Sequence, residues 1–256
     1  MIELRSFAED LAREAGALLQ AYRERPLEVG FKGDIDLVTA ADRDAEHLLR
    51  ERIRARYPDH AILGEEAGYE PGTSDFCWVL DPVDGTTNYA HGFPYYCVSV
   101  GLLRAGTLHV GAVFNPVLGE LFSAGAGGGA TLDGRPIRVS ATTELRRALL
   151  TTGFPYSVLQ DRANFDMFER FMLRSQAVRR AGSAALDLCH VACGRYDGFW
   201  ERGLSPWDVV AGAVILLEAG GALTDYIGGP FDPAGRELLA SNGTLHAVMI
   251  DVLAQA

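Results

Sequence analysis

Two aspartates stand three residues apart in the run DPVDGTTN, which covers residues 81–88 and directly follows the apolar residues 78–80. Asp81 and Asp84 would lie where a strand gives way to a turn, and paired carboxylates in such a place offer the oxygen ligands that a hard divalent cation prefers. Behind them, Gly85 and Thr86 would open a short helix, whose free N–H groups favour an anion such as phosphate. This segment therefore predicts a site that binds a metal ion and a phosphate group together.

The same run also fits an ordinary turn with a capped helix behind it, because Asp, Pro and Gly are common turn residues. Thr86 by itself fits a plain N-terminal helix residue. The strand-like residues ahead of Asp81 favour the functional interpretation, since they would deliver both aspartates to the edge of a sheet, where the active sites of α/β proteins tend to lie.

Three further acidic residues are placed in a similar way. Glu65, in the run GEE at 64–66, comes just after a short apolar stretch that predicts a strand. Asp208 precedes the apolar run 209–219, which predicts a buried helix, and Asp42 ends the run DLVTAAD. Taken singly, Glu65 fits an exposed acid, and the two aspartates fit helix N-caps. Their meaning depends on whether the fold brings them together.

The composition bounds the classes of partner. The chain has 256 residues, 48% of them hydrophobic, which is enough for a sizeable core. Its 34 acidic and 23 basic residues give a net charge of −11, a balance that disfavours nucleic acid and acidic membranes as partners. We find neither an apolar run of about 18 residues nor a signal peptide, and we expect a soluble cytoplasmic protein. Four cysteines without CxxC spacing predict buried free thiols.

Hydrophobic periodicity predicts the elements of the first half. Apolar residues at helical spacing indicate one helix over residues 4–22 and a second one that ends near Pro58. Between residues 95 and 139, short β-branched and apolar runs alternate with turn residues, which predicts a meander of antiparallel strands. The glycine-rich residues 125–129 lack the Lys-Ser/Thr ending of a phosphate loop, so we interpret them as a hairpin tip.

The second half alternates between helices and strands. We expect helices around 165–173, from Ser183 and from Trp207, with strands near Ala177 and at 196–200. This order is typical of a mixed α/β sheet. No long linker separates the halves, so we treat residues 1–256 as a single domain made of an N-terminal α+β half, 1–141, and a C-terminal α/β half, 142–256.

The acidic segments in their order along the chain resemble a known family. GEE, DPVDGTTN and WDVVAG, the last at 207–212, resemble the signature segments of the inositol monophosphatase family, a group of metal-dependent, lithium-sensitive phosphatases. DLVTAAD at 36–42, HGFP at 91–94 and RRAGSAALDL at 179–188 extend the resemblance over nearly the whole chain. It implies an α/β/α/β/α sandwich, with a six-stranded antiparallel sheet in the N-terminal half and a mixed sheet in the C-terminal half. It also implies a homodimer and inhibition by lithium.

The charges require a cofactor if the acids share a pocket. Glu65, Asp81, Asp84 and Asp208 would repel one another and a phosphate dianion, so divalent cations must neutralise them. An all-oxygen ligand set without His or Cys suits Mg²⁺, with Mn²⁺ as a substitute, better than Zn²⁺.

The resemblance assigns a role to each acid. It implies that one cation is held by Glu65, Asp81 and the carbonyl of Val83, that a second is held by Asp81, Asp84 and Asp208, and that a third binds more weakly beside Glu65. Two ions about 4 Å apart activate water and stabilise the leaving oxygen. Glu65 would orient and help deprotonate the water, assisted by Thr86, whose hydroxyl the family pairs with an acid matching Asp42. The N–H groups of Gly85 and Thr86 would bind phosphate.

Substrate binding is expected to combine both halves of the chain. The resemblance adds Gly182, Ser183, Ala184 and Glu201 to Asp84, Gly85, Thr86 and Asp208 as residues that bind substrate. A carboxylate at Glu201 favours the hydroxyls of a polyol phosphate. A helix cap at Ser183 and a surface acid at Glu201 are the structural alternatives.

The substrate stays open among related phosphomonoesters. We favour myo-inositol 1-phosphate, while fructose 1,6-bisphosphate, histidinol phosphate and nucleotide 3′-phosphates are the alternatives within the same chemistry. Some bacterial members of the family instead act with the transcription machinery, which is an alternative of another class. One segment departs from the family pattern, because Lys32 stands in a loop that is one residue shorter. A role at the third metal, a role in covering the pocket and a solvated lysine all stay open.

Overall fold

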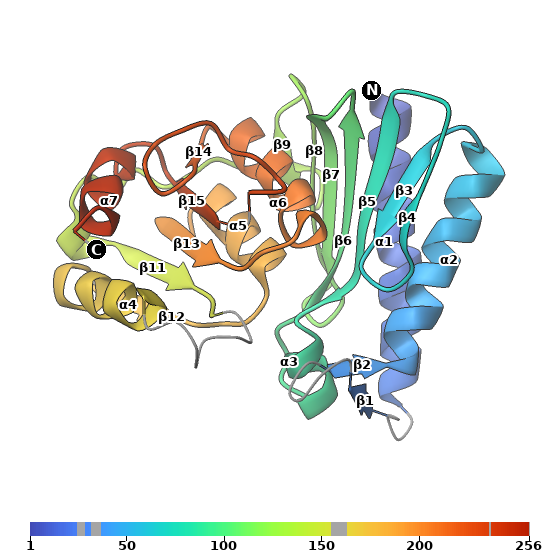
Figure 1. Cartoon of the computed structure of the whole chain (residues 1–256), viewed down its shortest axis with the longest axis horizontal. Coiled ribbons are helices and arrows are strands. Elements are labelled where there is room, and N and C mark those ends of the chain that lie inside the picture. Colours follow the sequence, from blue (N-terminus) through green and yellow to red (C-terminus); the bar gives the residue numbers. More distant parts are fainter. Residues whose placement is uncertain (25–28, 32–36, 155–162, 236, 256) are drawn as a thin grey trace.

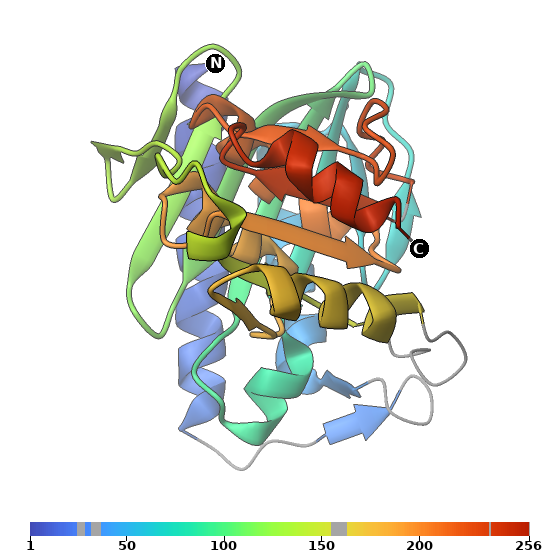
Figure 2. The same cartoon turned by 90° about the vertical axis from the view of Figure 1, so that its left-hand side faces the viewer.

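The computed structural model describes residues 1–24, 29–31, 37–154, 163–235 and 237–255. They form five layers, in the order helices, sheet, helices, sheet, helices (Figure 1), which confirms the predicted sandwich. The helical layers are, in turn, α1 (Ile2–Arg23) with α2 (Ala40–Arg56), α5 (Ala184–Ala192) with α6 (Pro206–Glu218), and α4 (Ala163–Arg174) with α7 (His246–Leu253). Figure 2 shows α4 and α7 covering the outer face of the smaller sheet. The prediction for Lys32 lies outside the described residues.

The larger sheet has eight strands in the order β10-β9-β8-β7-β6-β5-β3-β4. Their bounds are β3 (Ala61–Gly64), β4 (Gly68–Glu70), β5 (Phe76–Asp84), β6 (Cys97–Arg104), β7 (Thr107–Asn115), β8 (Glu120–Gly125), β9 (Ala130–Leu132) and β10 (Arg135–Pro136). Strands β6 to β10 pair consecutively and antiparallel, which confirms the predicted meander, and residues 126–129 form the tip between β8 and β9. The expectation of six antiparallel strands was wrong in two respects, because short edge strands add to the sheet and β3 runs parallel to β5.

The smaller sheet is mixed, as predicted. Strand β11 (Leu149–Thr152) is parallel to β12 (Ala177–Arg179) and to β13 (Gly198–Arg202). Strand β15 (Glu237–Ser241) is antiparallel to both β13 and β14 (Ala222–Thr224). The strand expected at 196–200 lies two residues later, because pairing with β15 continues through Glu201 opposite Leu238. Glu201 therefore belongs to the strand instead of following it.

Helix α6 is apolar on nearly all sides because it lies between the two sheets. Buried residues from Val209 to Leu216 pack against the larger sheet and α5. Gly111 in β7 permits this close approach, since a β-carbon there would lie 2.2 Å from the carbonyl oxygen of Ala211. This packing fixes the start of α6, and with it Asp208, at the end of β5 and β6.

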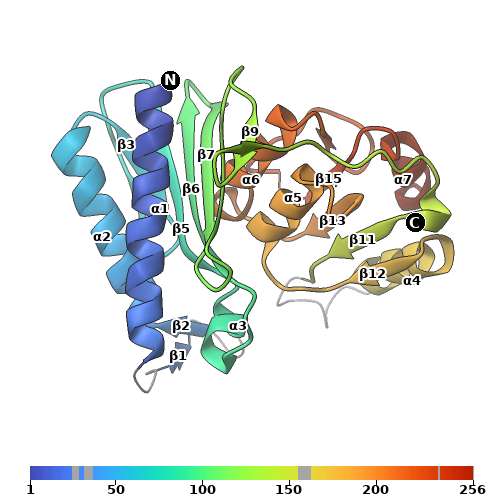
Figure 3. The same ribbon diagram turned by 180° about the vertical axis from the view of Figure 1, so that it is seen from behind.

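Three smaller elements lie beyond one end of the larger sheet. Helix α3 (Thr86–His91) is next to the hairpin of β1 (Val29–Phe31) and β2 (Leu37–Thr39), as Figures 1 and 3 show. A 3₁₀ turn, η1 (Leu145–Arg147), leads into the smaller sheet.

Among the described helices, none combines the length and apolar character that a bilayer crossing requires. All four cysteines are free thiols, with Cys97 and Cys189 buried and the other two partly so.

Candidate active site

A cavity of about 640 Å³ opens where the two halves of the chain meet. All predicted site residues except Asp42 line this cavity. They are Glu65, Asp81, Val83, Asp84, Gly85, Thr86, Gly182, Ser183, Ala184, Glu201 and Asp208. Residues from five separate segments therefore converge on one space.

The parallel pairing of β3 with β5 places Glu65 beside Asp81. Gly64 is opposite Leu80 in the ladder, and the N–H of Glu65 donates to the Leu80 carbonyl oxygen at 3.2 Å. Glu65 directly follows β3, and Asp81 stands one residue beyond Leu80 in β5, so the two acids lie at the same edge of the sheet. Strand pairing, rather than sequence spacing, therefore creates this neighbourhood.

Strand β5 does not give way to a turn at Asp81, as the sequence interpretation assumed. It continues to Asp84, but Asp81 is opposite Ser99 and Asp84 is opposite Cys97, so β5 has an extra residue at this point. Such a bulge bends a strand and re-aims its side chains. Here it turns both aspartates, which are almost fully buried, toward the cavity.

Each of three aspartates is held by a backbone donor. Asp81 Oδ1 accepts the N–H of Val83 at 2.9 Å, and Asp84 Oδ2 accepts the N–H of Ala185 at 2.7 Å. Asp208 Oδ2 accepts the N–H of Ser205 at 2.7 Å. Asp208 is the third residue of α6 in a capping box with Ser205, and so it is not the N-cap that was the structural alternative.

The same three aspartates form a group with the spacing of a metal site. Each offers one carboxylate oxygen, and these oxygens lie within 4.8 Å of one another. Among the described residues no His or Cys belongs to this group, so the donor set is all oxygen. Glu65 lines the same cavity just outside this tight group.

Burial and repulsion between neighbouring carboxylates both act against ionisation of this group. Burial and the carboxylates of Glu65, Asp84 and Asp208 raise the pKa of Asp81 well above its usual range. Burial raises the pKa of Asp84 to about 6, although hydrogen bonds from Ser183 and Ala185 oppose the shift. Partial burial and Asp84 raise the pKa of Asp208 as well. A hard divalent cation is the partner that such a group of oxygen ligands fits.

Thr86 begins α3 behind the aspartates. Its N-cap is Gly85 in a left-handed conformation with φ of 98°, which glycine adopts without strain. The Thr86 hydroxyl lies 3.0 Å from the Val83 carbonyl oxygen and 3.3 Å from Asp42 Oδ1. Asp42 is fully buried in the first turn of α2 and contacts the cavity lining at Thr86.

Ser183 connects the two halves of the chain. It is buried, and its hydroxyl donates to Asp84 Oδ2 at 2.6 Å. The Ser183 hydroxyl oxygen also caps α5, because it accepts the N–H of Leu186 at 3.4 Å. The helix-cap alternative therefore holds, and it coexists with a direct contact to a predicted metal ligand.

The opposite wall carries Glu201 and a residue that sequence reasoning missed. Glu201 faces the cavity instead of bulk solvent, and enclosure there, with Asp187 nearby, raises its pKa well above the usual range. Arg180 is the one basic side chain among the described residues that line the cavity. Asn88 also lines the cavity and was not predicted as a site residue, although it belongs to DPVDGTTN. Its side-chain amide donates to the carbonyl oxygens of Tyr95 at 2.7 Å and Ala181 at 2.9 Å. An arginine next to the GSAA segment was the available signal for Arg180.

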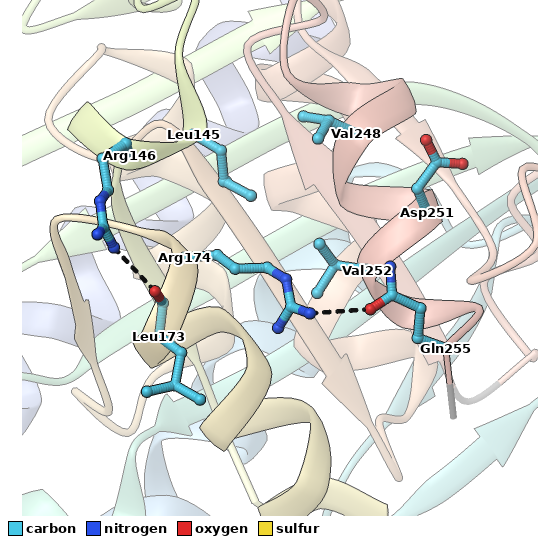
Figure 4. A pocket seen from close by; sticks show the side chains of 8 residues that line it. All are labelled: Leu145, Arg146, Leu173, Arg174, Val248, Asp251, Val252 and Gln255. Carbon is cyan, nitrogen blue, oxygen red and sulfur yellow. Dashed lines mark hydrogen bonds between the residues drawn. The ribbon is translucent and has the colours of Figure 1, made fainter.

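A second hollow of about 530 Å³ lies on the far side of the smaller sheet, between α4 and α7 (Figure 4). Its two guanidinium groups are already engaged, since Arg146 donates to Leu173 O at 2.9 Å and Arg174 donates to Gln255 at 3.0 Å. Asp251 is the one carboxylate among the described residues that line it. The described residues of this hollow offer no pair of acids for a metal ion, so we assign the chemistry to the first cavity.

Known proteins that resemble this chain over most of its length are phosphatases of one family and relatives named SuhB. The profile of the Inositol monophosphatase family matches residues 1–256. The chain is 50% identical over 222 residues to the inositol-1-monophosphatase of Synechocystis sp., covering 86% of this chain and 77% of that protein. It is 45% identical to the Nus factor SuhB of Pseudomonas aeruginosa, covering 85% and 83%. The structure of inositol monophosphatase from Anabaena (Nostoc) sp. superimposes with a TM-score of 0.92 at 46% identity, covering 99% and 96%.

Proposed function

The chain belongs to the inositol monophosphatase family of phosphatases, and from that premise we propose that it releases inorganic phosphate from myo-inositol 1-phosphate with the help of Mg²⁺. One observation carries the proposal: Asp81, Asp84 and Asp208 converge within 4.8 Å in a cavity that also receives the start of α3. An anionic substrate enters such a pocket only when cations neutralise its acids.

The donor set fits two hard cations. We assign Glu65, Asp81 and the Val83 carbonyl to one, and Asp81, Asp84 and Asp208 to the other, with a third ion beside Glu65 and Mn²⁺ as a substitute for Mg²⁺. When bound, such ions polarise a phosphoryl oxygen, acidify a water and stabilise a leaving oxygen.

Thr86 and Glu65 orient the attacking water in this proposal. The single hydroxyl hydrogen of Thr86 points to either Asp42 or Val83, both within hydrogen-bond distance. The oxygen of Thr86 therefore presents its lone pairs to the cavity and accepts a hydrogen bond from the water. Glu65, directly after β3, takes the other proton of that water as the new P–O bond forms. The ester P–O bond breaks in the same step, and the leaving alcohol oxygen takes up a proton from solvent water.

The start of α3 binds the phosphoryl group. The N–H groups of Gly85 and Thr86 belong to the first turn of a helix, where they have no intrahelical partners. They donate to the equatorial phosphoryl oxygens and are already in place before the transition state forms.

The leaving group faces Glu201 and the segment 182–184. A Glu201 carboxyl with a raised pKa is protonated over more of the pH range, so it can donate to one substrate hydroxyl and accept from another. Such a pair of bonds favours a polyol over a plain alkyl leaving group. Arg180 on the same wall favours a second anionic group, which keeps fructose 1,6-bisphosphate as the main alternative substrate.

A panel of substrates tests the proposal. Purified protein with Mg²⁺ is given myo-inositol 1-phosphate, fructose 1,6-bisphosphate, histidinol phosphate and a nucleotide 3′-phosphate, and phosphate release is measured. We expect the highest kcat/KM for the inositol ester. A preference for another ester would replace the substrate, and no release from any of them would remove the proposed activity.

A second candidate function follows from the relative named Nus factor SuhB. At 45% identity, a role as a binding partner of the transcription machinery is the alternative. Protein that binds a transcription factor and releases no phosphate from the panel would favour it. Homodimer formation, lithium inhibition and a cytoplasmic location stay predictions, and size-exclusion chromatography with light scattering tests the first of them.

A further inference from the structure

A buried ion pair lies on α2 directly beneath the segment that carries Glu65. Glu46 and Arg50 stand one helical turn apart, and Arg50 Nε donates to Glu46 Oε1 at 2.8 Å. Their side chains are only 2% and 7% exposed. A buried pair adds little net stability unless further hydrogen bonds satisfy its remaining atoms, so its other contacts indicate what it holds.

The Glu46 carboxylate binds the backbone that follows Glu65. Its Oε2 accepts the N–H of Glu66 at 2.7 Å, and its Oε1 accepts the N–H of Ala67 at 3.0 Å. Charge-assisted bonds of this kind are about twice as strong as those between neutral groups. The peptide immediately after Glu65 is therefore anchored to α2.

Arg50 extends the same anchor to the next strand. Its Nη2 donates to the Gly68 carbonyl oxygen at 2.5 Å, and its Nη1 lies 3.3 Å from Glu70 Oε2. The pair thus spans the whole connection from β3 to β4.

The backbone before Glu65 is fixed from the same side. A β-carbon on Gly64 would lie 2.3 Å from Glu46 Oε1, so the strand end lies directly against the carboxylate. The N–H of Glu65 is bound to Leu80 O at 3.2 Å. Because the chain is held on both sides of Glu65, the Glu65 backbone is fixed next to β5 without a ligand.

The spacing on α2 connects this anchor to the rest of the site. Asp42, Glu46 and Arg50 recur every four residues and therefore share one face of the helix. Asp42 contacts Thr86, while Glu46 holds the Glu65 segment. One helix face thus supports both residues to which the water-orienting step is assigned.

We propose that Glu46, paired with Arg50, is a positioning residue that holds Glu65 at the distance from Asp81 that a shared divalent cation requires. This inference rests on the proposed function only in assigning Glu65 to a cation. Glu46 is not among the described residues that line the cavity, so its role is indirect. Its effect is to lower the entropic cost of ordering Glu65 when the cation binds.

The test compares Glu46→Gln with Glu70→Gln. Gln keeps the size of Glu46, but its amide group replaces one acceptor, so either Glu66 or Ala67 loses its hydrogen bond. Glu70→Gln is the matched control, because it removes an equal charge from a partner of Arg50 without touching the 65–67 backbone. Mn²⁺ binding to metal-free protein is followed by electron paramagnetic resonance, and amide hydrogen exchange is measured at Glu66 and Ala67.

We expect Glu46→Gln to weaken Mn²⁺ binding about tenfold and to speed amide exchange at whichever of Glu66 and Ala67 loses its acceptor. Saturating Mg²⁺ should recover much of its kcat, whereas Glu70→Gln should match the wild type in all three measurements. Unchanged Mn²⁺ affinity in Glu46→Gln, or an equal loss in both variants, would overturn the proposal.

Arg50→Lys covers the case in which Glu46→Gln does not fold. It keeps the charge but loses the planar fork that reaches Gly68, so Mn²⁺ binding should weaken in the same direction. Wild-type affinity in Arg50→Lys would also overturn the proposal. The Mn²⁺ measurement needs no substrate, so a failed substrate panel would remove the proposed activity and leave this inference standing.

Discussion

The hydroxyl of Thr86 lies 3.3 Å from Oδ1 of Asp42, a fully buried acid that stands 44 residues earlier in the chain. The contact joins the start of α3 to the first turn of α2, and it orients the Thr86 oxygen toward the cavity. A buried aspartate without such a partner would be costly, so the pair has both a structural and a chemical role.

Replacement of this hydroxyl should therefore affect turnover more than folding. We expect Thr86→Ala to lower kcat on the order of 10²-fold, because the water loses its acceptor, while Thr86→Ser retains most of the activity. Steady-state kinetics with thermal unfolding as a control distinguishes the two variants. Equal kcat values for Ala and Ser would contradict the assigned role.

Asp208→Asn removes one ligand charge with little structural change. In the wild type, the Ser205 N–H donates to Asp208 Oδ2 at 2.7 Å. The side-chain oxygen of Asn can accept the same hydrogen bond, so α6 keeps its cap. We expect kcat to fall by about 10²-fold or more, and circular dichroism and the melting temperature of metal-free protein should show an intact fold. Turnover at the wild-type level would refute the assignment of Asp208 as a ligand.

Protons and Mg²⁺ should compete for the three aspartates. The pKa of Asp84 is raised from 3.8 to about 6 in the folded protein, so the folded state holds its proton more tightly than the unfolded state does. Metal-free protein therefore loses stability as the pH rises from about 4 to about 6. The increase in melting temperature on adding Mg²⁺ should be larger at pH 8 than at pH 5. An equal increase at both pH values would count against a carboxylate site.

Asp187 offers a separate test of burial next to the site. Burial raises its pKa to about 8, although the Tyr95 hydroxyl donates to its Oδ1 at 2.7 Å. The stability associated with the protonated acid is complete below the unfolded pKa of 3.8 and is lost as the pH rises through about 8.

Asp187→Asn keeps an acceptor for Tyr95 and cannot ionise. We expect its free energy of unfolding to match that of the wild type near pH 4 and to exceed it at pH 8, with a gap that grows by up to about 1.4 kcal/mol per pH unit. Urea unfolding at several pH values measures this. A constant gap across the pH range would show that Asp187 does not ionise as inferred.

Helices and the meander were predictable because their signals are local. The apolar spacing over residues 4–22 and the apolar run after Asp208 predicted α1 and α6 within a few residues. The acids near sheet edges were found for the same reason, since Glu65 and Asp81 both follow β-branched or apolar runs.

Long-range pairing could not be read from the sequence. Nothing in the residues shows that β3 runs parallel to β5, yet this register is what places Glu65 beside Asp81. The end of β13 was misplaced because β15, almost forty positions away, extends it through Glu201. Glu46 was overlooked because an acid in a charged helix predicts a solvated face, whereas the fold buries it against the Glu65 segment.

The most direct test of the account is anomalous diffraction from crystals soaked in Mn²⁺. We predict anomalous density between the carboxylates of Asp81, Asp84 and Asp208, with a second peak adjacent to Glu65 and the Val83 carbonyl. Crystals that show all three aspartates in place but no anomalous density among them, at a Mn²⁺ concentration that supports turnover, would contradict it.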